Sequence, residues 1–135
     1  MLLEEALYSK LTGTAAITAL VGTRIFPGYL PQTAALPAMS YWRVAGMREH
    51  AQGTDPGVAR PRIQIDAWGK KYSQVQSVAD ALRTALQDSS GLWGGVGGVT
   101  ILAVHYYGDS HFYEDETEVH HIASEFVIWH SESRT

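Results

Sequence analysis

Hydrophobic positions at the start of the chain recur every three or four residues, which is the spacing of one face of an α-helix. The residues at this spacing are Leu3, Ala6, Leu7 and Leu11. Gly13 interrupts the pattern, and a second short helical turn with Ile17, Leu20 and Val21 follows it. Gly22 ends that turn, since glycine is the residue that most readily closes a helix. The beginning of the chain is therefore predicted to be helical.

The conformation expected of the next segment, 23–37, follows from its prolines. Pro27, Pro31 and Pro37 each bias the preceding residue away from helix, so the segment is expected to be an extended connector. The run AMSYWRVA at 38–45 follows and is rich in aromatic and β-branched residues. Such a run predicts a β-strand.

A second strand is predicted at 62–68, where hydrophobic and other residues alternate. Ile63, Ile65 and Ala67 point one way, as expected of a half-buried strand. Between the two strands, segment 46–60 contains several glycines and has no sustained period. Two strands joined by such a long excursion predict an antiparallel pair with a protruding loop at about 46–60.

The clearest helix signal lies after this strand. Ser73 and Gln76 have the spacing of a capping box. One apolar stripe then runs along the predicted helix through Val75, Val78, Ala79, Leu82 and Leu86. Polar residues cover the other side, and the sequence Ser-Ser-Gly at 89–91 ends the helix.

The last third of the chain predicts two more strands. A glycine-rich connection leads to a strand at 99–107, and an acidic loop at 108–118 separates it from a final strand at 119–129. Taken as one domain over residues 1–135, the chain is predicted to have an α+β fold. We expect a single antiparallel-rich mixed sheet of about four strands, with two helices packed on one face.

Composition and charge exclude several classes of function. The 135 residues carry a formal net charge of −4 and no cysteine. The size permits a hydrophobic core without disulfides or metals. The charge gives no basic footprint for nucleic-acid binding, and the absence of cysteine excludes disulfides and thiolate zinc sites.

The sequence also lacks the usual signals for export and membrane insertion. Two acids among the first five residues do not fit a signal peptide, which starts basic and continues with a long apolar run. No stretch approaches the roughly 18 apolar residues that a membrane-spanning helix needs. The protein is expected to stay soluble.

Six histidines raise the question of a metal site. His120 and His121 follow the acidic loop, with His105 and His111 upstream. Neighbouring residues on a strand point to opposite faces, so His120 and His121 cannot bind one ion together without a bulge. We interpret these residues as polar side chains of a solvated hairpin. His111, one of the pair and a carboxylate remain an alternative ligand set.

No pattern indicates catalysis or nucleotide binding. The glycine-rich stretch at 91–98 follows a helix and opens a strand, whereas a dinucleotide-binding loop follows a strand and opens a helix. Asp66 is expected to form a structural ion pair with Arg62 or Arg43. The serines that we considered as nucleophiles, none in an elbow-type turn, are Ser40, Ser73, Ser110 and Ser124. No catalytic residue, cofactor or metal ligand is predicted.

Aromatic residues instead favour an interaction surface. Trp42, Trp68 and Trp129 fall on strand faces that alternate with the predicted core face. Tryptophan and tyrosine are enriched in interfaces because they bury a large area at low entropic cost. The alternative is that the N-terminal helix of the chain covers this second face.

Several segments together resemble a known family. They are the N-terminal helix, the sequence Gly-Thr-Arg-Ile-Phe-Pro at 22–27, the pair Leu36–Pro37, and the block QIDAWGKKYSQVQSVADALRTAL at 64–86. Over nearly its whole length the chain resembles the tail-completion proteins of long-tailed phages, prophages and gene transfer agents. The shared positions are structural and include no catalytic signature.

The resemblance implies a tail terminator. Such a protein forms a six-fold ring at the head-proximal end of the tail tube, stops tube polymerisation and joins the tail to the head connector. The implied partners are further copies of the chain, the tail-tube protein and a connector or stopper protein, with DNA passing through the lumen without specific binding. Another head–tail connector or assembly adaptor, and a metal-dependent enzyme, remain alternatives.

The residues expected to form the interfaces come from the 46–60 arm and from the aromatic positions. The arm is expected to reach a neighbouring subunit or the tail tube, because a long structureless loop in a compact domain is usually functional. The predicted interface residues are Arg48, Glu49, His50, Gln52, Asp55, Arg60, Trp68, Trp93, Tyr113 and Trp129.

Overall fold

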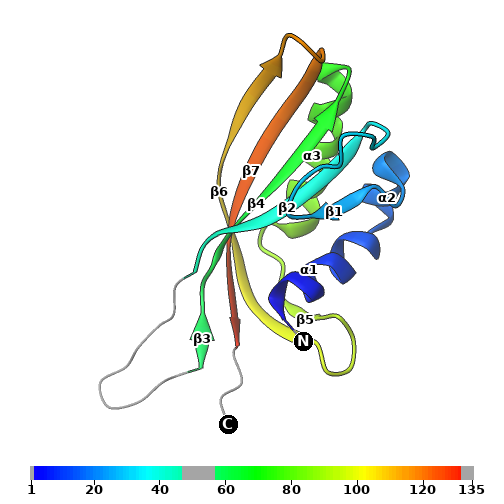
Figure 1. Cartoon of the computed structure of the whole chain (residues 1–135). Coiled ribbons are helices and arrows are strands. Elements are labelled where there is room, and N and C mark those ends of the chain that lie inside the picture. The colour runs from blue at the N-terminus through cyan, green and yellow to red at the C-terminus, as the bar shows by residue number, and fades with distance from the viewer. Residues whose placement is uncertain (1, 47–56, 132–135) are drawn as a thin grey trace.

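The structure is a computed structural model that describes residues 2–46 and 57–131. Its helices and strands form an α+β arrangement, as predicted, in which two helices, four strands, one helix and three strands follow one another in the described residues (Figure 1). The elements are α1 (Leu3–Thr12), α2 (Ala15–Val21), β1 (Ile25–Pro27), β2 (Ala38–Ala45), β3 (Val58–Ala59), β4 (Arg62–Gly69), α3 (Tyr72–Leu86), β5 (Gly91–Trp93), β6 (Val99–Glu114) and β7 (Val119–Ser131).

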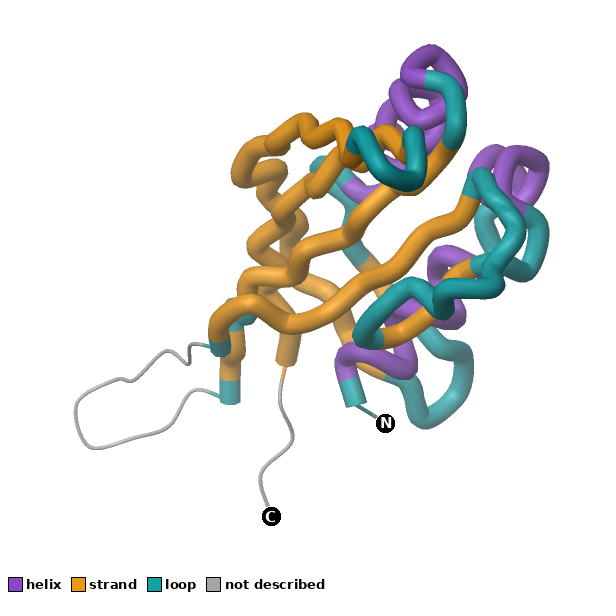
Figure 2. The backbone as a smooth tube through the Cα atoms, turned by 45° about the horizontal axis from the view of Figure 1, so that its top comes forward, coloured by secondary structure: helices purple, strands orange, loops and turns teal. Residues whose placement is uncertain are grey.

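One curled sheet runs through the molecule in the order β1-β2-β4-β7-β6-β5, and β3 pairs with the end of β7 (Figure 2). Among the strands of residues 2–46 and 57–131, only β1 and β2 pair in parallel, so the predicted antiparallel-rich mixed sheet is confirmed. The predicted number of about four strands is wrong, because the sheet has seven strands in the described part of the chain. The missed strands β1, β3 and β5 have two or three residues each, which is too short to show a period in sequence.

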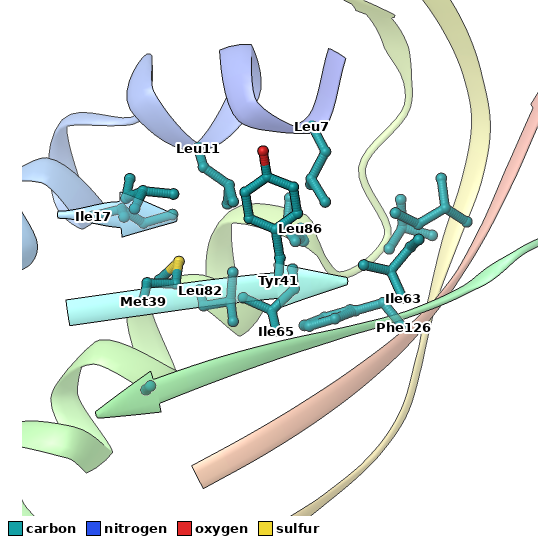
Figure 3. Packing of buried hydrophobic residues seen from close by; sticks show 14 of the residues in the cluster. Leu7, Leu11, Ile17, Met39, Tyr41, Ile63, Ile65, Leu82, Leu86 and Phe126 are labelled. Carbon is teal, nitrogen blue, oxygen red and sulfur yellow. The ribbon is translucent and has the colours of Figure 1, made fainter. Parts of the chain in front are cut away.

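The helices number three in the described residues, and not two as predicted. α2 was expected only as a short turn, and it forms seven residues of helix. All three helices contribute to one core on one face of the sheet (Figure 3), where Leu7, Ile17 and Leu82 pack over the central strands. Ile63, Ile65 and Phe126 lie beneath them and are fully buried. The expected packing of helices on a single face is therefore confirmed.

The long helix α3 starts earlier than its capping signal indicated. It begins at Tyr72, and Lys71 precedes it without a side-chain capping bond. Ser73 lies inside the first turn, where its carbonyl oxygen accepts a hydrogen bond from the Ser77 hydroxyl. The predicted capping box is wrong, whereas the predicted apolar stripe is confirmed. Its most buried members are Val75, Val78, Leu82 and Leu86.

The hairpin of β6 and β7 is longer than predicted. The acidic segment 108–114 continues β6 as a strand, and only 115–118 forms the turn. Gly108 had indicated a loop, but it lies at an irregularity of the β6–β7 register, between Tyr106 and Gly108. A glycine within a strand often marks such a bulge. The tip of the hairpin lies beside the end of β4 and the start of α3, as Figure 1 shows.

The predicted antiparallel pairing of 38–45 with 62–68 is confirmed as β2–β4. Most of the predicted arm, residues 47–56, lies outside the described residues. Its last part forms β3, where Val58 and Ala59 pair with Ser131 and His130 of β7. Within the described part of the chain, no helix is both long and apolar enough to cross a membrane.

Candidate interaction surfaces

The sheet has a second face, opposite the helices, which we call the helix-free face. On β4 it carries Gln64, Asp66 and Trp68, because these residues alternate with the buried Ile63, Ile65 and Ala67. The N-terminal helix packs on the other face, since Leu3, Ala6, Leu7 and Leu11 all belong to the main core. The alternative that this helix covers the second face is therefore wrong.

Asp66 is the buried centre of the helix-free face, with 5% of its surface exposed. Its Oδ1 accepts a 2.8 Å hydrogen bond from Gln64 Nε2. His121 Nε2 lies 3.1 Å from the same oxygen, close enough for an ion pair when the ring is protonated but poorly aligned for a hydrogen bond. A buried carboxylate needs such partners, because an unpaired buried charge is strongly destabilising.

Aromatic rings cover this carboxylate. The Trp68 and His121 rings stack with their centroids 3.8 Å apart and their planes 8° from parallel. The Trp68 indole N–H donates to Ser40 Oγ at 3.0 Å, and Phe112 lies against His121 with a centroid distance of 5.3 Å. Cross-strand pairing explains the cluster, because Trp68 and Phe112 each stand directly opposite His121 in the register. Adjacent strands therefore build one rigid, mainly aromatic surface.

An open groove of about 700 Å³ borders this cluster. One wall is the connector 28–37, with Tyr29, Leu30 and Leu36, and the floor includes Asp66 and Trp68. The connector therefore covers only part of the helix-free face. Trp42 on β2 remains 43% exposed, and Phe112 on β6 remains 55% exposed.

Two arginines on neighbouring strands pair with carboxylates other than Asp66. The predicted partners of Asp66 are wrong, because Arg43 pairs with Glu4 at 2.9 Å and Arg62 approaches Glu125 at 3.4 Å. Arg43 alternates to the helix side, where α1 supplies the carboxylate. Arg62 is on the helix-free face, and its guanidinium also lies over the Tyr107 ring at 4.9 Å.

Two of the predicted aromatic positions lie near the end of β7 and the start of β6. The Arg60 guanidinium lies 5.5 Å from the centroid of the Trp129 ring, and Trp129 is half-buried. Trp93 on β5 belongs to the core and is only 4% exposed. A partner can therefore reach Trp129 in this structure, whereas Trp93 packs inside the chain.

The helix side of the β6–β7 hairpin carries a separate polar cluster. The Tyr72 hydroxyl lies 2.6 Å from His111 Nδ1, and the ring of His120 contacts those of Tyr72 and Tyr113. His120 and His121 therefore point to opposite faces, as predicted. Among the described residues, no group of three or more His, Asp or Glu side chains is placed to hold a metal ion.

Next to this cluster, Tyr106 donates a hydrogen bond to Asp109 Oδ2 at 2.6 Å. Burial and this hydrogen bond raise the pKa of Tyr106 to about 12. The pKa of Tyr41 in the core is also raised to about 12, chiefly by burial. Both tyrosines are therefore neutral at physiological pH, and neither is poised for proton transfer there.

Of the predicted interface residues, the structure places five. Trp68 and Trp129 are half-buried on the helix-free face, Tyr113 is 51% exposed on the hairpin, and Arg60 stacks on Trp129. Trp93 lies in the core. The remaining five, Arg48, Glu49, His50, Gln52 and Asp55, lie outside the described residues.

Sequence reasoning missed three important members of the helix-free face. Asp66 was read as a simple ion-pair partner, His121 as a solvated residue, and Phe112 as part of a loop. Phe112 was missed because the segment 109–114 shows no alternation of hydrophobic and polar residues. The Asp66–His121 contact depends on the register between β4 and β7, for which the sequence gives no signal.

The sequence of the chain is similar to a known protein family, and its fold is similar to that of a chain in a known particle. A family profile described as "Tail completion protein gp17" matches residues 5–131. Among curated proteins, none matches the sequence significantly. A solved structure described as "Virion of native gene transfer agent (GTA) particle" contains a chain with a similar fold. The TM-score is 0.68 at 16% identity, and the match covers 96% of this chain and 94% of that chain.

Proposed function

Because the chain belongs to the tail completion protein gp17 family, whose members are structural proteins of phage-type tails, we propose that it is a tail terminator. In this role, copies of the chain form a ring at the head-proximal end of the tail tube. The ring stops tube polymerisation and presents a surface to the head connector. The similar fold of a chain in a gene transfer agent particle supports an assembled, particle-bound role.

The observation that carries the proposal is the uncovered helix-free face. Fully buried interface cores are depleted in charged residues and enriched in aromatic ones. This face offers Trp42, Tyr107 and Phe112, each more than 40% exposed, around the rigid Trp68–His121 stack. A second surface is also needed, because a cyclic ring is built from two different patches on each subunit. We assign that role to the helix layer.

The charge balance suits the proposed location. DNA must slip through the ring, and a strongly basic lining would hold its phosphates. The chain has a formal net charge of −4. The chemistry described above supports a structural rather than a catalytic role, since the polar clusters are held in hydrogen bonds and stacking contacts.

The first test measures tail length in particles that lack this protein. A terminator is expected to leave overlong or variable tubes without heads when it is absent, because nothing else stops polymerisation. An assembly adaptor of another type would leave tails of normal length or no tails. Normal tail length in its absence would therefore refute the terminator role.

The second test examines the surface. Phe112→Glu and Tyr107→Glu place a charge on exposed positions of the helix-free face, and both are expected to abolish rings in negative-stain images of purified protein. Val96→Glu is the matched control, because Val96 is fully exposed in the 94–98 loop and gains the same charge. Circular dichroism should show that all three variants fold. Rings in both face variants would contradict this surface assignment.

A further inference from the structure

The long strand β6 leaves most of one edge open. Its outer neighbour β5 pairs only with Val99, Thr100 and Ile101. Among the described residues, no strand pairs with residues 102–114 on the side away from β7. An open edge of this length presents a row of backbone donors and acceptors to which another chain can add a strand.

Two hydrogen bonds identify which backbone groups point outward. The Asp88 N–H donates to the Val104 carbonyl oxygen from outside the sheet, and the Ile128 N–H donates to the Pro61 oxygen, away from β6. The pair Val104–Ile128 is therefore not hydrogen-bonded between β6 and β7. Antiparallel pairs alternate in this respect. The residues of β6 that follow with outward-facing backbone are Tyr106, Asp109, His111 and Tyr113.

The opposite edge of the sheet is closed by comparison. β1 has three residues, and its Ile25 N–H already donates to the Thr23 oxygen at 2.9 Å. Pro27, the last residue of β1, has no N–H to offer. A short strand with proline is a common way to protect a sheet edge.

The β6 edge lacks such protection beyond its bulge at Tyr106–Gly108. Residues 99–119 contain no proline, lysine or arginine. Phe112 and Tyr113 are more than half exposed, one on each face of the strand. They give an added strand apolar neighbours on both sides of the sheet. The regular stretch 109–114 is thus an accessible template.

The same segment is strongly acidic. Asp109 and Glu114 lie on the strand, and Asp115, Glu116 and Glu118 lie in or beside the turn. The nearby cations include Lys70, whose Nζ binds the Thr117 oxygen, and Arg83, whose guanidinium lies over the Tyr106 ring and lines the same groove as Asp109. Complementary charge steers partners and rejects like-charged ones. The favoured partner strand is therefore basic.

We propose that the 109–114 edge of β6 accepts an extended, lysine- or arginine-rich strand from a different structural protein of the particle. The identity of the partner as a particle protein rests on the proposed tail function, whereas the strand-pairing site rests on the edge itself. A second copy of this chain is disfavoured as the occupant. Pairing β6 with itself brings acid against acid, and the β1 edge of another copy is closed.

The first experiment uses a short peptide of alternating lysine and valine as the probe. Amide exchange followed by NMR reports Asp109, His111 and Tyr113 individually. Exchange at these amides is expected to slow about tenfold or more at saturating peptide, because strand pairing protects the bonded N–H groups. A glutamate–valine peptide of equal length should have no effect.

Two variants separate the backbone from the side chain. His111→Pro removes one outward N–H without breaking a bond to β7, while His111→Ala removes only the imidazole. The alanine variant should retain the protection by peptide and the proline variant should lose it, with both folded by circular dichroism. Should the proline variant unfold, Tyr113→Lys provides a second test, since a lysine on the edge repels a basic strand.

The outcomes distinguish the candidates. Equal protection by both peptides would refute the charge argument, and protection that persists in His111→Pro would refute edge pairing. Protection that grows with protein concentration alone would identify a second copy as the occupant and overturn the proposal. Ring formation is scored separately on the same samples, so a failure of the terminator role leaves the peptide result readable.

Discussion

The two faces of the sheet use the same strands for different purposes. On β4 and β7, the residues under the helices, such as Ile63, Ile65 and Phe126, are apolar and fully buried. Their sequence neighbours on the helix-free face include Asp66, Trp68 and His121, which contact one another laterally. The first face is closed by the chain itself. The second is organised without a covering layer of helices.

This difference indicates what each face is for. A face destined for the chain's own helices would be apolar, and a face destined only for water would carry few aromatic rings. The helix-free face has exposed aromatic rings around a polar centre in which Asp66 accepts a hydrogen bond from Gln64 and His121 stacks on Trp68. A surface preorganised in this way loses little entropy when a partner docks. The comparison therefore supports the proposal that one face stabilises the fold and the other serves assembly.

The largest expected effect separates the faces by stability. Phe126→Ala should lower the free energy of unfolding by about 3–5 kcal/mol, because it leaves a cavity in the core. Phe112→Ala, on the exposed side of the hairpin, should cost less than about 1 kcal/mol, since most exposed substitutions have small effects. Denaturant titration of both variants provides the check. Similar losses in the two would show that the helix-free face also carries the fold.

An intermediate effect is expected at Asp66, which is buried although it lies on the helix-free face. Asp66→Ala should cost about 1–3 kcal/mol, because it removes the acceptor of the Gln64 hydrogen bond and the carboxylate beside His121. Asp66→Asn keeps the shape and one acceptor, and should cost less. The measurement is again denaturant unfolding at neutral pH. If Asp66→Ala leaves the free energy of unfolding unchanged, the aromatic stack does not depend on this carboxylate.

High pH is expected to lower the free energy of unfolding through a tyrosine on the helix-covered side of the sheet. Burial raises the pKa of Tyr41 to about 12, above its ordinary value of 10. A raised folded-state pKa means that this contribution is complete below pH 10 and is lost as the pH rises from 10 towards 12. Unfolding curves across this range should show the decline, and Tyr41→Phe should reduce it. An unchanged pH profile in Tyr41→Phe would assign the decline elsewhere, with Tyr106 the next residue to test.

The sequence predicted the elements that bury a regular stripe. α3 and β4 each carry several apolar residues at regular spacing, so the spacing alone identifies them. Both lie within a few residues of their predicted bounds. The capping signal at Ser73 was misleading because serine, which often caps helices, also occurs in their first turn. β1 and β5 were missed because three residues cannot display a period.

The candidate surface was predictable only in outline. Alternation correctly assigned Trp68 to the face opposite Ile63 and Ile65, and it correctly separated His120 from His121. The contact of Asp66 with His121 joins residues far apart in sequence, and it depends on strand register. Register is set by turns and by the packing of the whole sheet, so local patterns did not reveal this contact.

The smallest expected effect in the free protein gives the finest test of the comparison. Arg43–Glu4 on the helix side and Arg62–Glu125 on the helix-free face are similar, partly exposed ion pairs. In double-mutant cycles on the free protein, each pair should contribute less than about 1 kcal/mol, because solvent screens partly exposed charges. Assembly should distinguish them, since a pair at the rim of an interface steers docking. Arg62→Ala should therefore slow ring formation more than Arg43→Ala, as followed by light scattering. If both variants assemble equally fast, the part of the helix-free face around Arg62 and Glu125 lies outside the interface.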